Sequence, residues 1–324
     1  MEQLLTTNRV VASDTDASAA APETVRAAFA PPVPLDRAKR FTRRLALGHY
    51  ENFSVLSILL PNRLKQDFSN VYAFCRTADD LGDEVSDRAL ALSYLGRFRD
   101  YTYACYEGRA LSPLFVALRE TIARHDIPIQ PFLDLIDAFE QDQRVNRYDN
   151  FAQLVDYCRR SADPVGRLVL YMCGYRDPRR QQLSDRTCTA LQLANFWQDV
   201  RRDILDRDRI YIPADSMRQF GVTEEQIRDG HRNQAFCDLM RFEIDRTTEW
   251  FDQGDALLPM LDSTIRRHVA LFASGGRAVL ESIRAQNYDT LSRRPTLSRW
   301  RKGTLVARAL GTGIAARLGG RPTE

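Results

Sequence analysis

Two short runs of oxygen-bearing side chains, far apart in the chain, could together hold a divalent cation. The first run ends a largely apolar stretch, and the second has its polar residues at intervals of four. An interval of four places side chains on the same face of a helix. The residues are Asp79, Asp80 and Asp83 in the first run, and Asn195, Asp199 and Asp203 in the second. Facing each other across a helical cavity, the runs would form a cage for Mg²⁺.

The chemistry of Mg²⁺ suits such a site. The ion takes six oxygen ligands, keeps several waters, and is usually held by a few carboxylates together with substrate phosphate oxygens. Carboxylates among apolar neighbours such as Phe74 and Trp197 are costly without a cation, whereas the alternative reading makes each run a solvated helix face. Arg76 lies one turn before Asp79, and Tyr72 one turn before Arg76, so a guanidinium for phosphate stands beside the metal ligands.

The elements that must position these runs are helices. Apolar residues recur at intervals of three and four from about Leu35, and no strand pair, repeat or internal linker interrupts this pattern. Pro61 fits the first turn of the helix of the first run, and Ser184 is the expected N-cap of the helix of the second. Pro164 interrupts a helix between the runs. We expect an all-α, single-domain helical bundle around a central cavity.

The domain limits follow from composition. Residues 1–35 are rich in Ala, Ser, Thr, Asp and Pro and are expected to form a disordered or loosely packed tail. Residues 36–295 are expected to form the helical domain, and residues 296–324, which contain Trp300, are expected to form a basic amphipathic segment. Such a segment suits an anionic membrane surface, and the equal alternative is that its apolar side packs on the domain.

Composition also excludes several classes of function. The net charge is only +3 over 324 residues, and acidic and basic residues are interleaved, so the sequence lacks the basic patch that is typical of nucleic-acid-binding proteins. The six cysteines are well separated, so neither a zinc site nor a disulfide framework is indicated. No stretch is long and apolar enough to span a bilayer, and the motifs of hydrolases, NTPases and nicotinamide enzymes are missing. We expect a cytoplasmic protein, with peripheral contact on the inner face of the membrane as a further hypothesis.

Both runs resemble the aspartate-rich motifs of the squalene/phytoene synthase family. The stretch from Tyr72 to Asp83 is similar to the first motif of that family, and the stretch from Asn195 to Pro213 is similar to the second. The segments 49–53 and 157–167 look most like the bacterial hydroxysqualene synthase branch of hopanoid biosynthesis. The resemblance covers most of the chain, from about His49 to Arg294.

The resemblance implies an isoprenoid synthase fold in which Mg²⁺ links the acidic motifs to a diphosphate. It makes Asp79, Asp80, Asp83, Asn195, Asp199 and Asp203 the metal ligands or their close neighbours. It assigns substrate contacts to His49, Asn52, Phe53, Arg76, Gln192 and Arg209. It assigns catalytic roles to Tyr72, Tyr157, Asp80 and Asp199, with the tyrosines along the reacting chain, where they can stabilise positive charge.

In the hydroxysqualene branch the implied reaction starts from presqualene diphosphate. Departure of diphosphate leaves a cation that rearranges and is captured by water to give hydroxysqualene, without NADPH. The alternatives are a presqualene diphosphate or phytoene synthase, which joins two prenyl diphosphates such as farnesyl diphosphate, and a non-catalytic helical assembly factor. Neighbouring enzymes of the squalene pathway are the expected protein partners.

Overall fold

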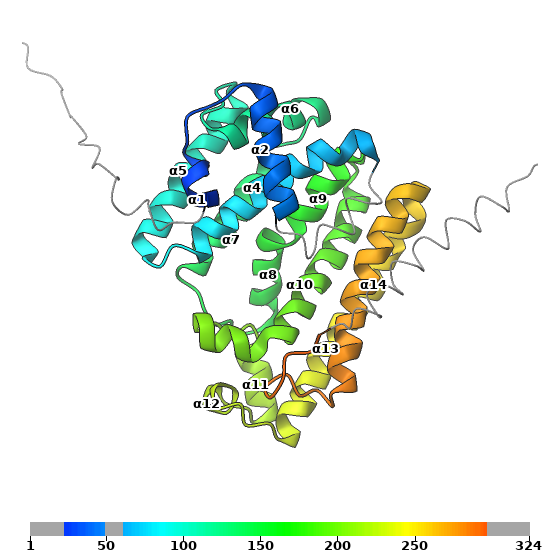
Figure 1. Cartoon of the computed structure of the whole chain (residues 1–324). Helices are drawn as coiled ribbons and strands as arrows, with labels where there is room; N and C mark the ends of the chain where they lie inside the picture. Colours follow the sequence, from blue (N-terminus) through cyan, green and yellow to red (C-terminus); the bar gives the residue numbers. More distant parts are fainter. Residues whose placement is uncertain (1–22, 49–60, 297–324) are drawn as a thin grey trace, which may run out of the picture.

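The computed structural model describes residues 23–48 and 61–296, which form helices and, within those ranges, no strand (Figure 1). The predictions for His49, Asn52, Phe53 and the C-terminal segment 297–324 therefore lie outside the described residues. The shorter helices are α1 (Glu23–Ala28), α2 (Leu35–Gly48), η1 (Asn62–Leu64), α6 (Pro113–His125), α7 (Gln130–Asp142), α8 (Phe151–Ser161), α9 (Asp163–Met172), α11 (Ala214–Phe220), α12 (Glu224–Arg228) and η2 (Asp255–Met260). The longer ones are α4 (Lys65–Asp83), α5 (Arg88–Tyr106), α10 (Pro178–Arg207), α13 (Gln234–Gly254) and α14 (Ser263–Ala285).

Two large clusters of buried apolar side chains organise the bundle. One, called the upper cluster below, joins α1, α2, α4, α5, α6 and α7. It includes Phe74, whose ring packs against Phe98 and Phe132. The other, called the lower cluster below, joins α8, α10, α13 and α14. It includes Trp197, which donates a hydrogen bond to Thr247 Oγ1 at 2.8 Å. Figure 1 shows α13 and α14 running beside α10 from the bottom of the view along its right-hand side, while α4 lies in the upper half. The two acidic runs thus belong to helices of different clusters.

Most helix boundaries follow the sequence signals. Asp87 and Asn150 accept hydrogen bonds from backbone amides of the first turns of α5 and α8, as their N-cap positions require. Asp126 ends α6 in a left-handed conformation, with φ of 48°. Pro164 stands in the first turn of α9 and separates that helix from α8, as expected.

Two boundary predictions are wrong. Ser184 lies inside α10, which begins a full two turns earlier because Asp177 caps it by accepting from the Arg180 amide. A polar residue within a helix gives the same local signal as a cap, and here Ser184 is buried against α9. Pro61 precedes the short helix η1 instead of opening α4.

The N-terminal segment also differs from the expectation of a loose tail. Within residues 1–35, Glu23–Ala28 form α1, and its Val25 and Ala28 are buried against the upper cluster. Phe29 then packs on the rings of Tyr94 and Tyr101 in α5. The prediction is wrong for this part because a few apolar residues suffice for order once a neighbouring helix offers an apolar face.

None of the described helices combines the length and the apolar character that crossing a bilayer requires.

Candidate active site

The carboxylates at the end of α4 are held by an arginine of the same helix. Arg76 contacts Asp79 Oδ2 through Nη1 at 3.1 Å and Asp80 Oδ1 through Nη2 at 2.5 Å. Asp80 is buried, and Thr24 of α1 donates a hydrogen bond to its other oxygen, Oδ2. The expected proximity of Arg76 to the first acidic run is confirmed, and α1 is an additional neighbour of this run.

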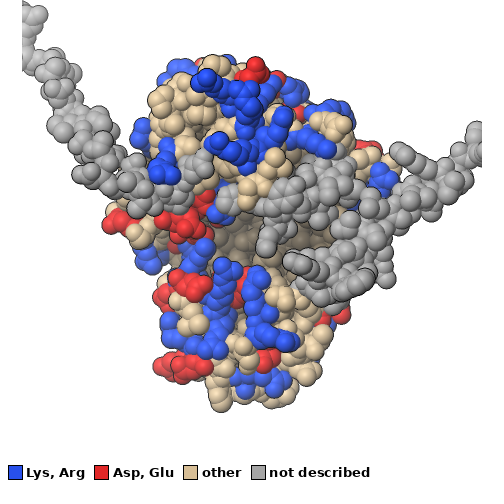
Figure 2. Space-filling view, viewed as in Figure 1, with Lys and Arg blue, Asp and Glu red and all other residues tan. Residues whose placement is uncertain are grey.

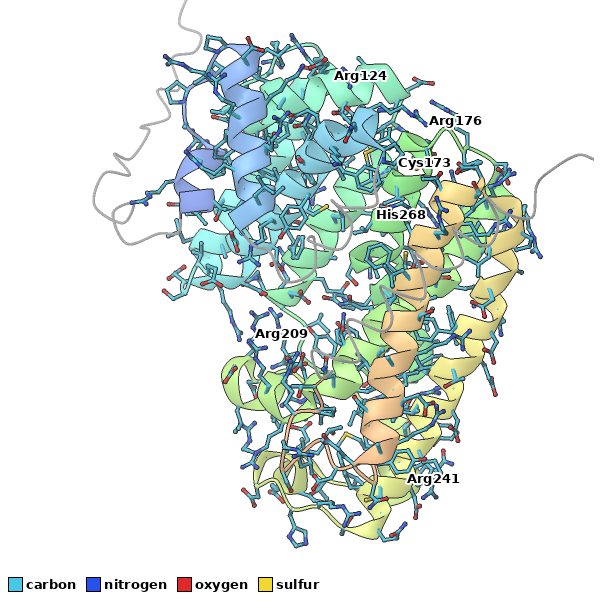
Figure 3. All side chains as sticks on the ribbon, turned by 45° about the vertical axis from the view of Figure 1, so that its right-hand side comes forward. Arg124, Cys173, Arg176, Arg209, Arg241 and His268 are labelled. Carbon is cyan, nitrogen blue, oxygen red and sulfur yellow. The ribbon has the colours of Figure 1, made fainter. Side chains whose placement is uncertain are left out.

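Asp83 connects α4 to the end of α10. Its carboxylate pairs with Arg207, the last residue of α10, and accepts a hydrogen bond from Arg209 Nη1 at 3.4 Å. Arg209 is itself buried and lies 3.7 Å from Asp142 Oδ2 at the end of α7. Figure 3 labels Arg209 between the upper and the lower groups of helices. Three helices therefore meet around two arginines.

The second run lies along one face of α10, as predicted. Asp199 is partly buried and pairs with Arg294, whose Nη2 donates to Asp199 Oδ2 at 3.0 Å. Asp203 follows one turn later and is half-buried. Asn195 is exposed, although apolar residues flank it in the sequence. Its apolar neighbours in sequence, including Trp197, point to the other face of the helix and are buried there.

Burial and mutual repulsion raise the pKa of several carboxyl groups at this site. The pKa of Asp203 rises to about 7 because of burial and the neighbouring Asp199. The pKa of Asp79 rises to about 6 through desolvation and the charge of Asp83. Burial likewise raises the pKa of Asp142 to about 7, although Arg209 opposes the shift. Burial is the largest cause of each shift, and a cation bound beside these groups would favour their charged forms.

The donor set fits Mg²⁺ shared with a diphosphate better than an ion enclosed by protein alone. Within the described ranges, no three side chains among His, Cys, Asp and Glu form a ready cluster of metal ligands. Arg76 and Arg207 pair with carboxylates of α4, and their guanidinium groups are also suited to phosphate oxygens. Carboxylate oxygens from both helices, completed by waters and diphosphate, would supply the oxygen ligands that Mg²⁺ prefers.

Aromatic rings pack next to the charged groups. Tyr157 of α8 is buried, and its hydroxyl donates to Asp142 Oδ2 at 2.9 Å. Its ring lies near those of Tyr148, Phe196 and Tyr211, and the last two are stacked with centroids 3.6 Å apart. Burial raises the pKa of the Tyr157 hydroxyl well above its usual value, so the group stays neutral. The aromatic cluster therefore adjoins the charged groups through the contact of Tyr157 with Asp142.

Tyr72 and Gln192 occupy the faces that carry the acidic runs. Tyr72 lies one turn before Arg76 and is half-buried, and burial raises the pKa of its hydroxyl. Gln192 lies one turn before Asn195 on α10 and is also half-buried. Figure 2 shows that the surface is hollowed between the upper and lower halves, with charged side chains at the edge of the hollow.

The sequence interpretation missed four groups of this site. Arg207 was detectable, because it continues the interval of four that links Asp199 and Asp203. Asp142 stands in a polar stretch that resembles an ordinary helix end, and neither Arg294 nor Tyr211 has a periodic signal. These residues join the site only through contacts between distant segments.

The chain is similar to known proteins over most of its length. A family model described as squalene/phytoene synthase matches residues 47–301. The chain belongs to the squalene/phytoene synthase family. This membership confirms the resemblance of the two acidic runs and supports an isoprenoid synthase. The chain is similar to the phytoene synthase of Thermus thermophilus, with 31% identity over 86% of this chain and 93% of the relative.

Three further relatives are a squalene synthase, a hydroxysqualene synthase and a dehydrosqualene synthase. The crystal structure of squalene synthase HpnC from Alicyclobacillus acidocaldarius is 43% identical, with a TM-score of 0.75, covering 81% of this chain and 99% of the other. The hydroxysqualene synthase of Zymomonas mobilis is 39% identical over 54% of this chain and 59% of its own length. A dehydrosqualene synthase structure, at 22% identity and a TM-score of 0.78, shares the fold. The predicted all-α isoprenoid synthase fold is confirmed.

Proposed function

We propose that the protein is a hydroxysqualene synthase that converts presqualene diphosphate and water to hydroxysqualene and diphosphate. The observation that carries the proposal is the 43% identity to squalene synthase HpnC, which extends over 99% of that chain. The similarity to the hydroxysqualene synthase of Zymomonas mobilis supports the same branch.

The charged groups have a direct use in this reaction. Arg76, Arg207 and Arg209 contact carboxylates in the structure and would turn to the oxygens of the bound diphosphate. The predicted ligands on α4 and α10 would then be free to hold Mg²⁺. When bound there, Mg²⁺ would neutralise charge that develops on the leaving diphosphate. The resemblance adds His49 and Gln192 to the proposed diphosphate contacts.

The reacting carbon chain needs an apolar surface that tolerates positive charge. The carbon–oxygen bond breaks, its electron pair leaves with diphosphate, and the cyclopropylcarbinyl cation rearranges before a water oxygen adds and loses a proton. Tyr72 and Tyr157 are the proposed residues along this path. Tyr157, with Phe196 and Tyr211 beside it, presents ring faces next to the charged groups.

The decisive experiment is product analysis. Purified protein is incubated with Mg²⁺ and either presqualene diphosphate or farnesyl diphosphate, without NADPH, and the lipid extract is examined by mass spectrometry. We expect hydroxysqualene from presqualene diphosphate. Presqualene diphosphate as the product from farnesyl diphosphate would contradict the proposal and assign the chain to the preceding condensation.

A head-to-head prenyl transferase remains the second candidate. The similarity to the phytoene synthase of Thermus thermophilus, which covers 93% of that protein, favours it. Both reactions begin with loss of diphosphate, so the acidic runs serve either one. A condensation product from prenyl diphosphates, with no turnover of presqualene diphosphate, would support this alternative.

The metal assignment is tested by Asp80→Asn and Asp199→Asn. Each removes one charge from an acidic run, and we expect diphosphate release to fall at least about a hundredfold, because a leaving group with unbalanced charge departs slowly. Circular dichroism should retain the helical signal. Asp206→Asn is the matched control, since Asp206 lies on the exposed side of α10 in an i,i+4 pair with Arg202. Normal turnover in both site variants would refute the assignment, and inactivity of the folded wild-type protein with both substrates would favour the non-catalytic assembly factor.

A further inference from the structure

A second feature of the surface is a groove of about 1020 Å³ along α2, apart from the acidic runs. Four arginines of α2 line it, and every other lining residue is apolar or glycine. No carboxylate is among the lining residues. The arginines are Arg37, Arg40, Arg43 and Arg44.

The arginines stand on the outer face of α2. Arg37, Arg40 and Arg44 follow at intervals of three and four, opposite the buried side formed by Ala38, Thr42, Leu45 and Ala46. Arg37 and Arg40 are exposed, and their side chains make no hydrogen bond or ion pair with any described residue. Figure 2 shows Lys and Arg side chains gathered over the top of the molecule, where Figure 1 places α2. Among the described residues, no acidic side chain therefore pairs with Arg37 or Arg40.

Apolar side chains are mixed with these charges. Leu47 lies on the same face one turn after Arg44, and 44% of its surface is exposed. Phe41 lies between Arg37 and Arg44 and is half-buried in the groove. Val33 and Ala30 extend the apolar lining before the helix begins. Guanidinium groups around an apolar strip fit a ligand that has anionic head groups above hydrocarbon.

We propose that this outer face of α2, from Arg37 to Leu47, docks on a bilayer that contains anionic phospholipid. The arginines contact lipid phosphates, while Phe41 and Leu47 enter the boundary between head groups and acyl chains. Charge complementarity selects this occupant, because the groove pairs arginines with apolar lining and has no acidic residue. The benefit to catalysis, transfer of a water-insoluble product to the membrane, rests on the proposed function.

The docking face is firmly connected to the helix of the first acidic run. Thr42 Oγ1 donates to Asn70 Oδ1 of α4 at 2.6 Å, and Arg43 Nη2 donates to Gln66 Oε1 at 2.6 Å. Thr42 is fully buried, so α2 is a rigid part of the upper cluster. A membrane bound to α2 would thus hold α4, and the candidate active site with it, in one orientation.

The test is cosedimentation of the full chain with phosphatidylcholine vesicles, with and without phosphatidylglycerol. We expect binding only to the anionic vesicles, with weakening at high salt. The double variant Arg37→Gln, Arg40→Gln should bind about tenfold or more weakly, because each arginine near an anionic surface contributes several-fold to affinity. The control is Arg218→Gln, Arg232→Gln, which removes the same charge from exposed positions in the lower half and should bind as the wild type does.

Other results would overturn the proposal. Equal binding of the two double variants to anionic vesicles would exclude the α2 face, and no binding by the wild type would leave an acidic protein as the better occupant. Turnover in detergent without vesicles should be unchanged by Arg37→Gln, Arg40→Gln. A loss there would make the groove a capture site for prenyl diphosphate. If docking depends on α2 but no hydroxysqualene forms, the docking proposal stands and the proposed function fails.

Discussion

Carboxylates at the candidate active site are paired with arginines that also suit phosphate. Arg76 holds Asp79 and Asp80, Arg207 holds Asp83, and Arg294 holds Asp199. Such pairs keep charged groups in place without a fixed metal, because each partner lowers the cost of the other's partial burial. Arrival of a diphosphate with Mg²⁺ would exchange these pairs for new ones of the same kind, and we propose this exchange as the role of the arginines.

A pH-dependent stability is expected from Asp163, a residue outside this site. Asp163 is buried and accepts a hydrogen bond from Thr189 at 2.8 Å, and burial, with the nearby charge of Asp185, raises its pKa to about 8. Between its ordinary pKa and about 8 the native state retains a proton that the unfolded state releases. The group therefore favours folding at low pH, and its contribution is lost as pH rises, by up to about 1.4 kcal/mol per pH unit.

Thermal unfolding of wild type and Asp163→Asn measures this effect. Asparagine keeps the shape and an acceptor for Thr189 but does not titrate, so we expect the midpoint of the wild type to fall relative to the variant between about pH 5 and about pH 8. Parallel curves for the two proteins would show that the carboxyl group does not retain its proton in the folded state.

At the scale of elements, α10 has two faces with different tasks. One face carries Asn195, Asp199 and Asp203, and the other packs on α13 and α14 in the lower cluster. Small residues on the neighbouring helices permit the close contact. A Cβ atom added to Gly276 of α14 would lie 2.5 Å from Phe251 Cζ and 2.7 Å from Leu191 Cδ2. The register of α14 on α10 therefore depends on this glycine.

Gly276→Ala should consequently destabilise the protein. Phe251 is fully buried and cannot withdraw, so the added methyl group should cost about 1–3 kcal/mol, more than the gain of about 1 kcal/mol that alanine brings to a helix. Gly275→Ala is the control, because a Cβ atom there would meet nothing within 4 Å. Denaturant unfolding should show a lower midpoint for the first variant and an equal or higher midpoint for the second. The same midpoint for both would mean that α14 can shift at no cost.

At the scale of the whole molecule, the candidate active site lies between the two apolar clusters. The first acidic run belongs to a helix of the upper cluster and the second to a helix of the lower one. Among the described residues, Asp83 of α4 meets Arg207 of α10 across this boundary. A ligand that engages both runs would add a further connection between the halves.

Mg²⁺ together with inorganic diphosphate should therefore stabilise the folded protein. A ligand concentration of about a hundred times the dissociation constant adds about 2.7 kcal/mol to the free energy of unfolding, which a thermal shift measurement detects easily. The shift should disappear in Asp80→Asn and in Asp199→Asn and persist in Asp206→Asn. A shift that persists in both site variants would mean that the ligands bind somewhere other than between α4 and α10.

Several properties of this protein were determined by its sequence alone. Intervals of three and four predicted the helical class and placed Asp199 and Asp203 on one face, because helix periodicity is a local property. The two acidic motifs predicted the family and the fold. Arg76 was expected beside Asp79 for the same reason, since residues one helical turn apart are neighbours in any setting.

Only the tertiary structure decided which groups meet. The exposure of Asn195, the burial of Val25 in α1, and the contact of Asp142 with Tyr157 and Arg209 all depend on packing between distant segments. A sequence pattern shows that a helix has two faces, but which face meets solvent is set by the helix that packs against it. The spacing of apolar residues was sufficient to predict the helices. The charge environment of the site formed only when α4, α7, α8 and α10 packed together.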